Sequence, residues 1–144
     1  MCIRDRFVHI ARDPQALYRS TVGLWRSLNA EEGLQVVRDE SWIRPYVVNS
    51  LRRMYEAYFE DREALRDDQL VELRYEDLVE DPKSQLRDIY ERLDLGAFER
   101  IEPALDAHLH DVKNYRTNRH SMDDETRELI RDEWSRYFEE FGYD

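Results

Sequence analysis

The pattern of apolar and polar positions along the chain predicts two short strands. Phe7–Ala11 is a mostly apolar run that ends at Arg12-Asp13-Pro14, and Leu70–Arg74 is a second run of the same kind. Short apolar runs bounded by polar residues are typical of strands that lie inside a sheet. We therefore expect Phe7–Ala11 to be a buried strand and Leu70–Arg74 to be a second strand.

A helix is expected to begin directly after the first strand. Asp13 can cap its N-terminus, and Pro14 suits the first helical position, where no backbone N–H is needed. The apolar stripe predicted for this helix consists of Leu17, Leu24 and Leu28. Ser20 and Thr21 fall on the same stripe. Because a hydroxyl on an apolar face needs a hydrogen-bond partner, we expect this face to do more than fill a core.

The rest of the chain is predicted to be mainly helical, without a repeat or a linker. A polar loop is expected at Ala30–Glu40. Apolar residues at helical spacing predict further helices at Trp42–Leu65, at Pro82–Leu93, within Phe98–Leu109, and from Ser121 or Asp123 onward. The last helix is expected to bury Leu129, Ile130, Trp134, Tyr137 and Phe138. Strands separated by helices indicate an α/β fold with a parallel sheet.

Net charge restricts the ligands that the chain can bind. It has 22 lysines and arginines against 33 aspartates and glutamates, and its formal net charge is -11. We therefore expect no nucleic-acid partner, and any polyanion must be bound by local positive charge. Three stretches lack acidic residues but carry Arg or Lys: Pro14–Ala30, Ser41–Tyr55 and Val112–Met122.

Cysteine and histidine content argues against a disulfide and a metal site. The single cysteine, Cys2, excludes an intrachain disulfide and suits a reducing compartment, so a cytoplasmic location is expected. His108 and His110 would face different sides of a helix, and no metal is expected there. No apolar run reaches the length of a membrane span, and no secretory signal is present.

Arg12, Ser20 and Tyr75 are candidates for an anion or nucleotide site. Ligands of open α/β sheets bind at the carboxyl ends of the strands, and Arg12 and Tyr75 stand at those ends. Arg12 also precedes a helix N-terminus, which favours an anion, and Ser20 lies two helical turns further on. The alternative is that Arg12 pairs with a carboxylate and Ser20 with a backbone carbonyl.

Three stretches, in matching order and spacing, resemble sulfotransferases that use 3′-phosphoadenosine 5′-phosphosulfate. They are Phe7–Pro14 with Ser20-Thr21 and Leu24–Leu28; Leu73–Pro82; and Tyr115–Arg119 with Trp134 and Phe141–Tyr143. By this resemblance, Arg12 and Ser20 match the residues that bind the 3′-phosphate, and Tyr75 matches the aromatic residue that contacts adenosine. A basic segment that closes over the phosphate is matched, more loosely, by Lys113, Arg116 and Arg119; a solvated basic loop is the alternative.

The resemblance implies a P-loop-NTPase-like three-layer fold, of which this chain has two strands and a predominantly helical remainder. The family's loop for the 5′-phosphosulfate has no counterpart, because none of the four glycines forms such a loop. The catalytic base has no match either. We therefore interpret residues 7–144 as the C-terminal part of a single sulfotransferase domain, and Met1–Arg6 as a candidate non-native leader. The missing strands and loop are expected upstream.

The implied reaction is sulfuryl transfer from the nucleotide to a hydroxyl or amine of a small-molecule, lipid or carbohydrate acceptor. In-line displacement of this kind needs positioning and charge stabilisation but no metal. The loop Ala30–Glu40 and the helix after it are expected to form part of the acceptor wall. Two alternatives stay open: a P-loop-type small-molecule kinase relative, and a non-catalytic helical interaction domain. The sequence names neither the acceptor nor the oligomeric state.

We predict that the isolated chain transfers no sulfuryl group, because it lacks the phosphosulfate loop and a recognisable base. The measurement is a transfer assay with the nucleotide donor and a panel of hydroxyl acceptors. Measurable turnover by the isolated 144 residues would contradict the prediction.

Overall fold

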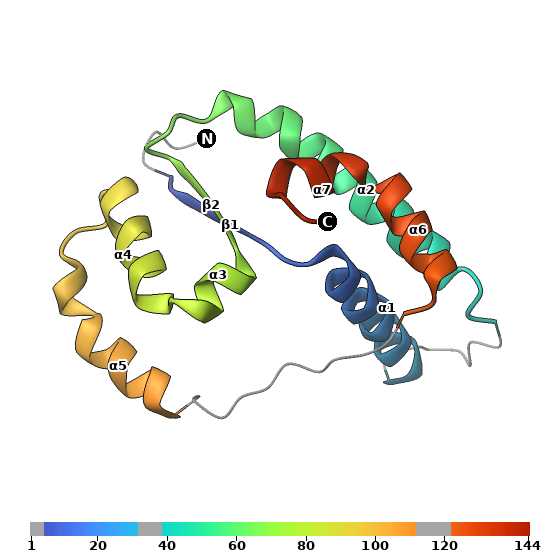
Figure 1. Cartoon of the computed structure of the whole chain (residues 1–144), viewed down its shortest axis with the longest axis horizontal. Coiled ribbons are helices and arrows are strands. Elements are labelled where there is room, and N and C mark those ends of the chain that lie inside the picture. The colour runs from blue at the N-terminus through green and yellow to red at the C-terminus, as the bar shows by residue number, and fades with distance from the viewer. Residues whose placement is uncertain (1–4, 32–38, 112–121) are drawn as a thin grey trace. The chain divides into compact units, whose positions relative to one another are not determined.

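A computed structural model of the chain describes residues 5–31, 39–111 and 122–144 (Figure 1). The chain divides into two compact units. Unit 1 comprises residues 1–11 and 62–119, and unit 2 comprises residues 12–61 and 120–144, each as far as it is described. The described residues form an α/β structure that is mostly helical, with one short two-stranded sheet.

Unit 1 is built on the parallel strands β1 (Phe7–Ala11) and β2 (Leu70–Arg74). Their register pairs Ala11 with Arg74 at the carboxyl end of both strands. Both predicted strands are confirmed with the predicted boundaries. Parallel strands need a long connection, and here the chain between them includes helices, as expected.

Within the described residues of unit 1, β2 is followed by three α-helices, α3 (Tyr75–Glu80), α4 (Pro82–Arg92) and α5 (Glu102–Asp111), and a short 3-10 helix, η2 (Phe98–Arg100), precedes α5. Helix α4 begins as predicted, with Pro82 in its first turn and the Asp81 carboxylate accepting a hydrogen bond from the Ser84 N–H at 3.1 Å. Helix α3 was not predicted, because its six residues are too few to display a helical period.

The core of unit 1 lies between β2 and α4. Val71 of β2 packs with Ile89 and Leu93, and all three side chains are buried. Leu73 and Leu86 pack against this cluster. The apolar spacing that predicted α4 therefore identified its buried face correctly.

Strand β1 is not buried, and the expectation from its apolar sequence was wrong. Phe7, Val8 and Ile10 keep 39%, 44% and 46% of their surface exposed. Within the described residues β2 is its one strand neighbour. The core cluster lies on β2 and α4, and three of the five side chains of β1 stay exposed.

Unit 2 consists of packed helices (Figure 1). Its described helices are α1 (Pro14–Glu31), α2 (Ile43–Asp61), α6 (Asp124–Glu133) and α7 (Ser135–Phe141). Helices α1, α2 and α6 contact one another. Their shared core contains Val22, Ile43, Val47, Ile130 and Trp134, all of them buried.

The buried face of α1 differs from the predicted leucine stripe. Pro14, Tyr18 and Val22, four residues apart, face α2 and α6, whereas Leu24 is 56% exposed. One position along a helix rotates a side chain by about 100°, so a stripe offset by one residue selects a different face. Because α1 packs against α2 and α6, the buried stripe is the one that contains the ring of Tyr18.

The last predicted helix is broken into α6 and α7 at Trp134. Helix α6 begins next to Asp123, one of the two predicted starts, and Asp123 caps it by accepting a hydrogen bond from the Thr126 N–H at 2.8 Å. The Trp134 indole N–H donates to the backbone oxygen of Val48 in α2, at 3.0 Å in the buried core. The chain thus bends where the indole is tied to another helix, which apolar spacing could not reveal.

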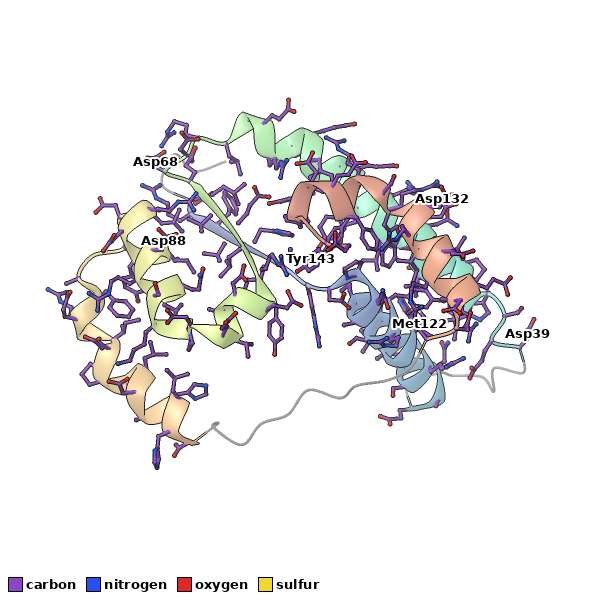
Figure 2. The ribbon with its side chains drawn as sticks, viewed as in Figure 1. Asp39, Asp68, Asp88, Met122, Asp132 and Tyr143 are labelled. Atoms are coloured by element: carbon purple, nitrogen blue, oxygen red, sulfur yellow. The ribbon has the colours of Figure 1, made fainter. Side chains whose placement is uncertain are left out.

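Much of the acidic surplus lies at the surface. Asp88 of α4 and Asp132 of α6 are exposed (Figure 2). In the part of the chain that the structure describes, no helix combines the length and the apolar character needed to cross a membrane.

We predict that Leu93→Ala destabilises the protein by about 2–5 kcal/mol, because it leaves a cavity against Val71 and Ile89. Leu95→Ala is the control, since Leu95 is 44% exposed, and should change stability by less than about 0.5 kcal/mol. Urea unfolding followed by circular dichroism measures both. Equal effects of the two substitutions would contradict the assigned core.

Candidate functional site

Arg12 stands where the chain leaves β1, between the strand and α1. It is half-buried. Its backbone N–H donates to the hydroxyl oxygen of Tyr137 at 2.9 Å, and the same hydroxyl donates to the Arg12 carbonyl oxygen at 2.7 Å. Tyr137 is buried in α7, so the backbone of Arg12 is held by the last helix of unit 2.

At the N-terminus of α1, Asp13 already accepts hydrogen bonds from backbone N–H groups of the first turn. Pro14 has no N–H, and the Ala16 N–H donates to the Asp13 carboxylate at 2.7 Å. The Leu17 N–H donates to the Asp13 carbonyl at 2.9 Å. The Asp13 charge also opposes an anion at this helix end. An anion beside Arg12 would therefore depend on side chains more than on helix amides, which revises the expectation from sequence.

Ser20 is exposed on α1, not on an inward stripe as expected. The physical reason is the rotation of α1 that buries Tyr18 and Val22. The neighbouring hydroxyl, Thr21 Oγ1, donates to the Leu17 carbonyl oxygen at 2.8 Å. A local partner of this kind was the alternative considered for Ser20, and it is observed at Thr21. The hydroxyl of Ser20 faces solvent, where a ligand can reach it.

Tyr75 follows β2 as Arg12 follows β1. It is half-buried and is the first residue of α3, with Arg74 as the extended N-cap residue. Glu76 and Asp77 occupy the first turn of α3, where negative charge is favourable. Tyr75 belongs to unit 1, whereas Arg12 and Ser20 belong to unit 2.

Three of the predicted site residues lie outside the described residues: Lys113, Arg116 and Arg119. Their assignment to the phosphate therefore stays a prediction.

Two of the stretches without acidic residues pack together. Pro14–Ala30 forms nearly all of α1, and Ser41–Tyr55 forms most of α2. The two helices contact each other, and Trp25 of α1 packs against Tyr46 of α2 with ring centroids 5.0 Å apart. The chain therefore concentrates arginines on neighbouring helices of unit 2, within a strongly acidic sequence. The third stretch lies largely outside the described residues.

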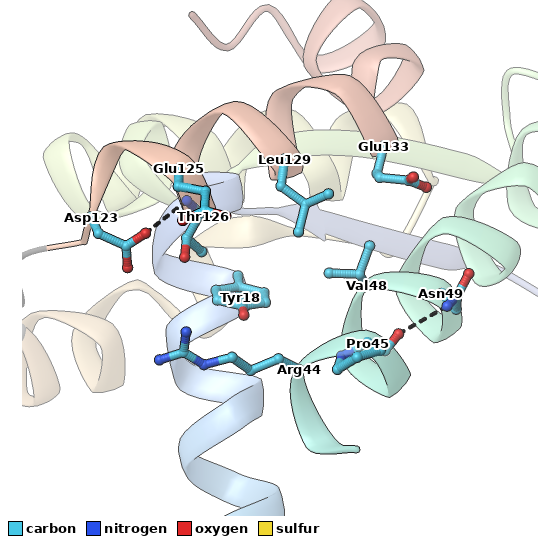
Figure 3. A pocket seen from close by; sticks show the side chains of 10 residues that line it. All are labelled: Tyr18, Arg44, Pro45, Val48, Asn49, Asp123, Glu125, Thr126, Leu129 and Glu133. Carbon is cyan, nitrogen blue, oxygen red and sulfur yellow. Dashed lines mark hydrogen bonds between the residues drawn. The ribbon is translucent and has the colours of Figure 1, made fainter. Parts of the chain in front are cut away.

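Helices α1, α2 and α6 line a pocket of about 500 Å³ (Figure 3). Its lining combines apolar and charged side chains, among them Tyr18, Val48, Leu129, Arg44 and Asp123. Hydrogen bonds from Thr126 lower the pKa of Asp123, and Arg44 adds a smaller effect in the same direction. Helix α2 is the helix that was expected to contribute to the acceptor wall, and that role stays a prediction.

Histidines do not form a metal site in the described residues. No group of three histidine, cysteine, aspartate or glutamate side chains gathers there. His9 is half-buried in β1, opposite Glu72 of β2. Burial lowers the pKa of His9, and the Glu72 carboxylate partly offsets this effect.

Tyr137 and Tyr55 are the residues that sequence reasoning missed. Tyr137 was expected to be core, and its ring does pack with Tyr55 and Phe141, at centroid distances of 4.4 and 4.9 Å. The hydroxyls of Tyr55 and Tyr137 also share a hydrogen bond. The available signal was a polar hydroxyl at a core position, since a buried tyrosine needs a partner. The sequence could not indicate which backbone would provide that partner.

Comparison with known proteins gives a consistent match. The sequence model of the Sulfotransferase family matches residues 4–100. An omega-hydroxy-beta-dihydromenaquinone-9 sulfotransferase, in both Mycobacterium bovis and Mycobacterium tuberculosis, is 37% identical over 139 residues. The match covers 96% of this chain and 36% of each relative.

A more distant relative is carbohydrate sulfotransferase 5 of Mus musculus. It is 30% identical over 115 residues, covering 74% of this chain and 28% of the relative. The chain thus spans about a third of the length of the curated relatives that it matches. No solved structure matches the chain significantly.

We predict that Asp13→Ala destabilises unit 2 by about 1 kcal/mol, because it removes the cap of α1. Asp13→Asn is the matched control, since asparagine caps as well as aspartate and should preserve stability. Thermal and urea unfolding measure both variants. If Asp13→Asn lowered stability as much as Asp13→Ala, Asp13 would stabilise unit 2 through its charge and not through capping.

Proposed function

Because the chain belongs to the sulfotransferase family, we propose that it binds 3′-phosphoadenosine 5′-phosphosulfate as part of an enzyme that sulfates a hydroxyl group. In this proposal Arg12 and Ser20 bind the 3′-phosphate, and Tyr75 contacts the adenosine. In this proposal the fold is P-loop-like.

The observation that carries the proposal is the position of Arg12. A guanidinium at the carboxyl end of a parallel strand occupies the edge where α/β proteins bind ligands. Its planar set of N–H donors suits a phosphate, which it can contact with two hydrogen bonds. The Tyr137 hydroxyl and the cap at Asp13 hold the backbone here, so mainly the side chain of Arg12 has to be ordered when an anion binds.

The donor groups of unit 2 fit a phosphate monoester. Arg12 supplies charge, and the exposed hydroxyl of Ser20 supplies a neutral donor from the same helix region. The packed helices α1 and α2 lack acidic residues along most of their length, so repulsion of the anion is reduced there.

When bound, the nucleotide supplies the sulfuryl group that the acceptor receives. The described residues would bind and orient that nucleotide. Arg12 and Ser20 hold the end bearing the 3′-phosphate, and Tyr75 can stack on or contact the base. Fixing a reactant in this way lowers the entropic part of the barrier for the transfer.

A lipid or carbohydrate hydroxyl is the proposed acceptor. By their names, the mycobacterial relatives act on omega-hydroxy-beta-dihydromenaquinone-9, and the mouse relative acts on a carbohydrate. The identity to the mycobacterial relatives is higher and extends over nearly the whole chain, which favours a hydroxylated lipid.

We predict that the chain binds adenosine 3′,5′-bisphosphate and that Arg12→Ala weakens this binding roughly ten- to a hundredfold. Loss of a hydrogen bond to a charged group costs about 1.5–3 kcal/mol. Arg53→Ala is the control, because Arg53 is exposed on α2 and its removal changes the net charge equally. Isothermal titration calorimetry measures both, with ATP as a competitor.

Each result has a distinct meaning. Selective loss in Arg12→Ala, with the bisphosphate preferred over ATP, supports the sulfotransferase site. Preference for ATP would favour the kinase alternative. Absence of any nucleotide affinity would contradict the proposal and favour an interaction domain.

A further inference from the structure

The Tyr137 hydroxyl makes an unusual set of contacts with one residue. It accepts a hydrogen bond from the Arg12 N–H and donates one to the Arg12 carbonyl oxygen, at 2.9 and 2.7 Å. It also shares a hydrogen bond with the Tyr55 hydroxyl. A hydroxyl can donate once and accept twice, so this set uses its whole capacity. We call the pair of contacts to Arg12 the Tyr137 bridge.

The Tyr137 bridge pairs both backbone polar groups of Arg12 at a point between two regular elements. The ladder between β1 and β2 ends at Ala11, and α1 begins at Pro14. Half-buried backbone groups need hydrogen bonds, and a single hydroxyl can serve an N–H and a C=O that face the same way. The bridge therefore restricts the backbone of Arg12, and with it the direction in which the side chain leaves the chain.

We propose that Tyr137 is a positioning residue for nucleotide binding, which acts by holding Arg12 in the orientation that contacts the 3′-phosphate. This inference rests on the proposed function of Arg12. Tyr137 itself touches no phosphate in this scheme. It reduces the conformational freedom that Arg12 would otherwise lose when the nucleotide binds, so its contribution appears as affinity.

The surroundings of Tyr137 separate this role from simple packing. Its ring packs with Tyr55 and Phe141 and stacks on Tyr143 with an interplanar angle of 3°. These ring contacts do not need the hydroxyl. Burial raises the pKa of Tyr137 far above its ordinary value, so the hydroxyl keeps its proton and its role as a donor at any working pH.

Tyr137→Phe tests the proposal, because it removes the bridge and keeps the ring. The whole 144-residue chain is titrated with adenosine 3′,5′-bisphosphate and with adenosine 5′-phosphate, which differ only in the 3′-phosphate. We expect Tyr137→Phe to weaken binding of the bisphosphate about tenfold, which corresponds to about 1.4 kcal/mol. Binding of adenosine 5′-phosphate should change less than about twofold.

Tyr55→Phe is the matched control. It removes a hydroxyl from the same aromatic cluster, and from a hydrogen bond to Tyr137, while the two contacts to Arg12 remain. We expect the preference for the bisphosphate to survive in this variant. A preference lost equally in both variants would show a general effect of the cluster and would overturn the proposal.

A double-mutant cycle with Arg12→Ala identifies the residue through which Tyr137 acts. If Tyr137 works through Arg12, then Tyr137→Phe costs no further affinity once Arg12 is alanine. Additive losses would overturn the proposal while leaving the function of Arg12 intact. Absence of a preference for the bisphosphate in the unchanged chain would instead overturn the proposed function, and this inference with it.

Amide hydrogen exchange on the unchanged chain tests the bridge without a variant, in case Tyr137→Phe does not fold. The Arg12 N–H is expected to exchange as slowly as amides inside α1, because it is bonded to a buried hydroxyl. Exchange of the Arg12 amide at the rate of an open loop would overturn the proposal.

Discussion

Between β1 and α1 the backbone passes through two residues that belong to neither element, and its polar groups must still be paired there. Asp13 solves this locally, since its side chain caps the helix that follows. Arg12 is served by Tyr137, from 125 residues further along the chain. Arg12, the candidate phosphate ligand, is therefore held in place by the hydrogen bonds that its own backbone needs. The role proposed for its guanidinium depends on these hydrogen bonds.

The C-terminal helices matter to the candidate site for this reason. Trp134 ends α6 and ties it to the Val48 carbonyl oxygen of α2. Helix α7 then begins at Ser135, and Tyr137 in its first turn donates a hydrogen bond to the Arg12 carbonyl oxygen. A continuous helix through Trp134 would place Tyr137 differently. The break that sequence periodicity missed therefore lies three residues before Tyr137, which binds Arg12.

Charged residues and exposed apolar residues are both distributed unevenly over the described residues. Helices α1 and α2 bring two arginine-bearing stretches without acidic residues together in a chain of net charge -11. Strand β1 exposes apolar side chains that were predicted from the sequence to be buried. The exposed strand suits a part of a larger sheet, and the relatives of this chain are about three times as long.

The sequence by itself determined the local features: the strands β1 and β2, the cap Asp13, the start of α4 at Pro82, the buried face of α4, and the resemblance that identified the family. These depend on neighbouring residues, so spacing and residue type suffice to predict them. The basic residues Lys113, Arg116 and Arg119 lie outside the described residues and remain predictions. Only the tertiary structure decided which stripe of α1 is buried, where the last helix breaks, and that Tyr137 binds Arg12. Each of these depends on a contact between residues far apart in the chain, and periodicity along a single segment carries no information about such a partner.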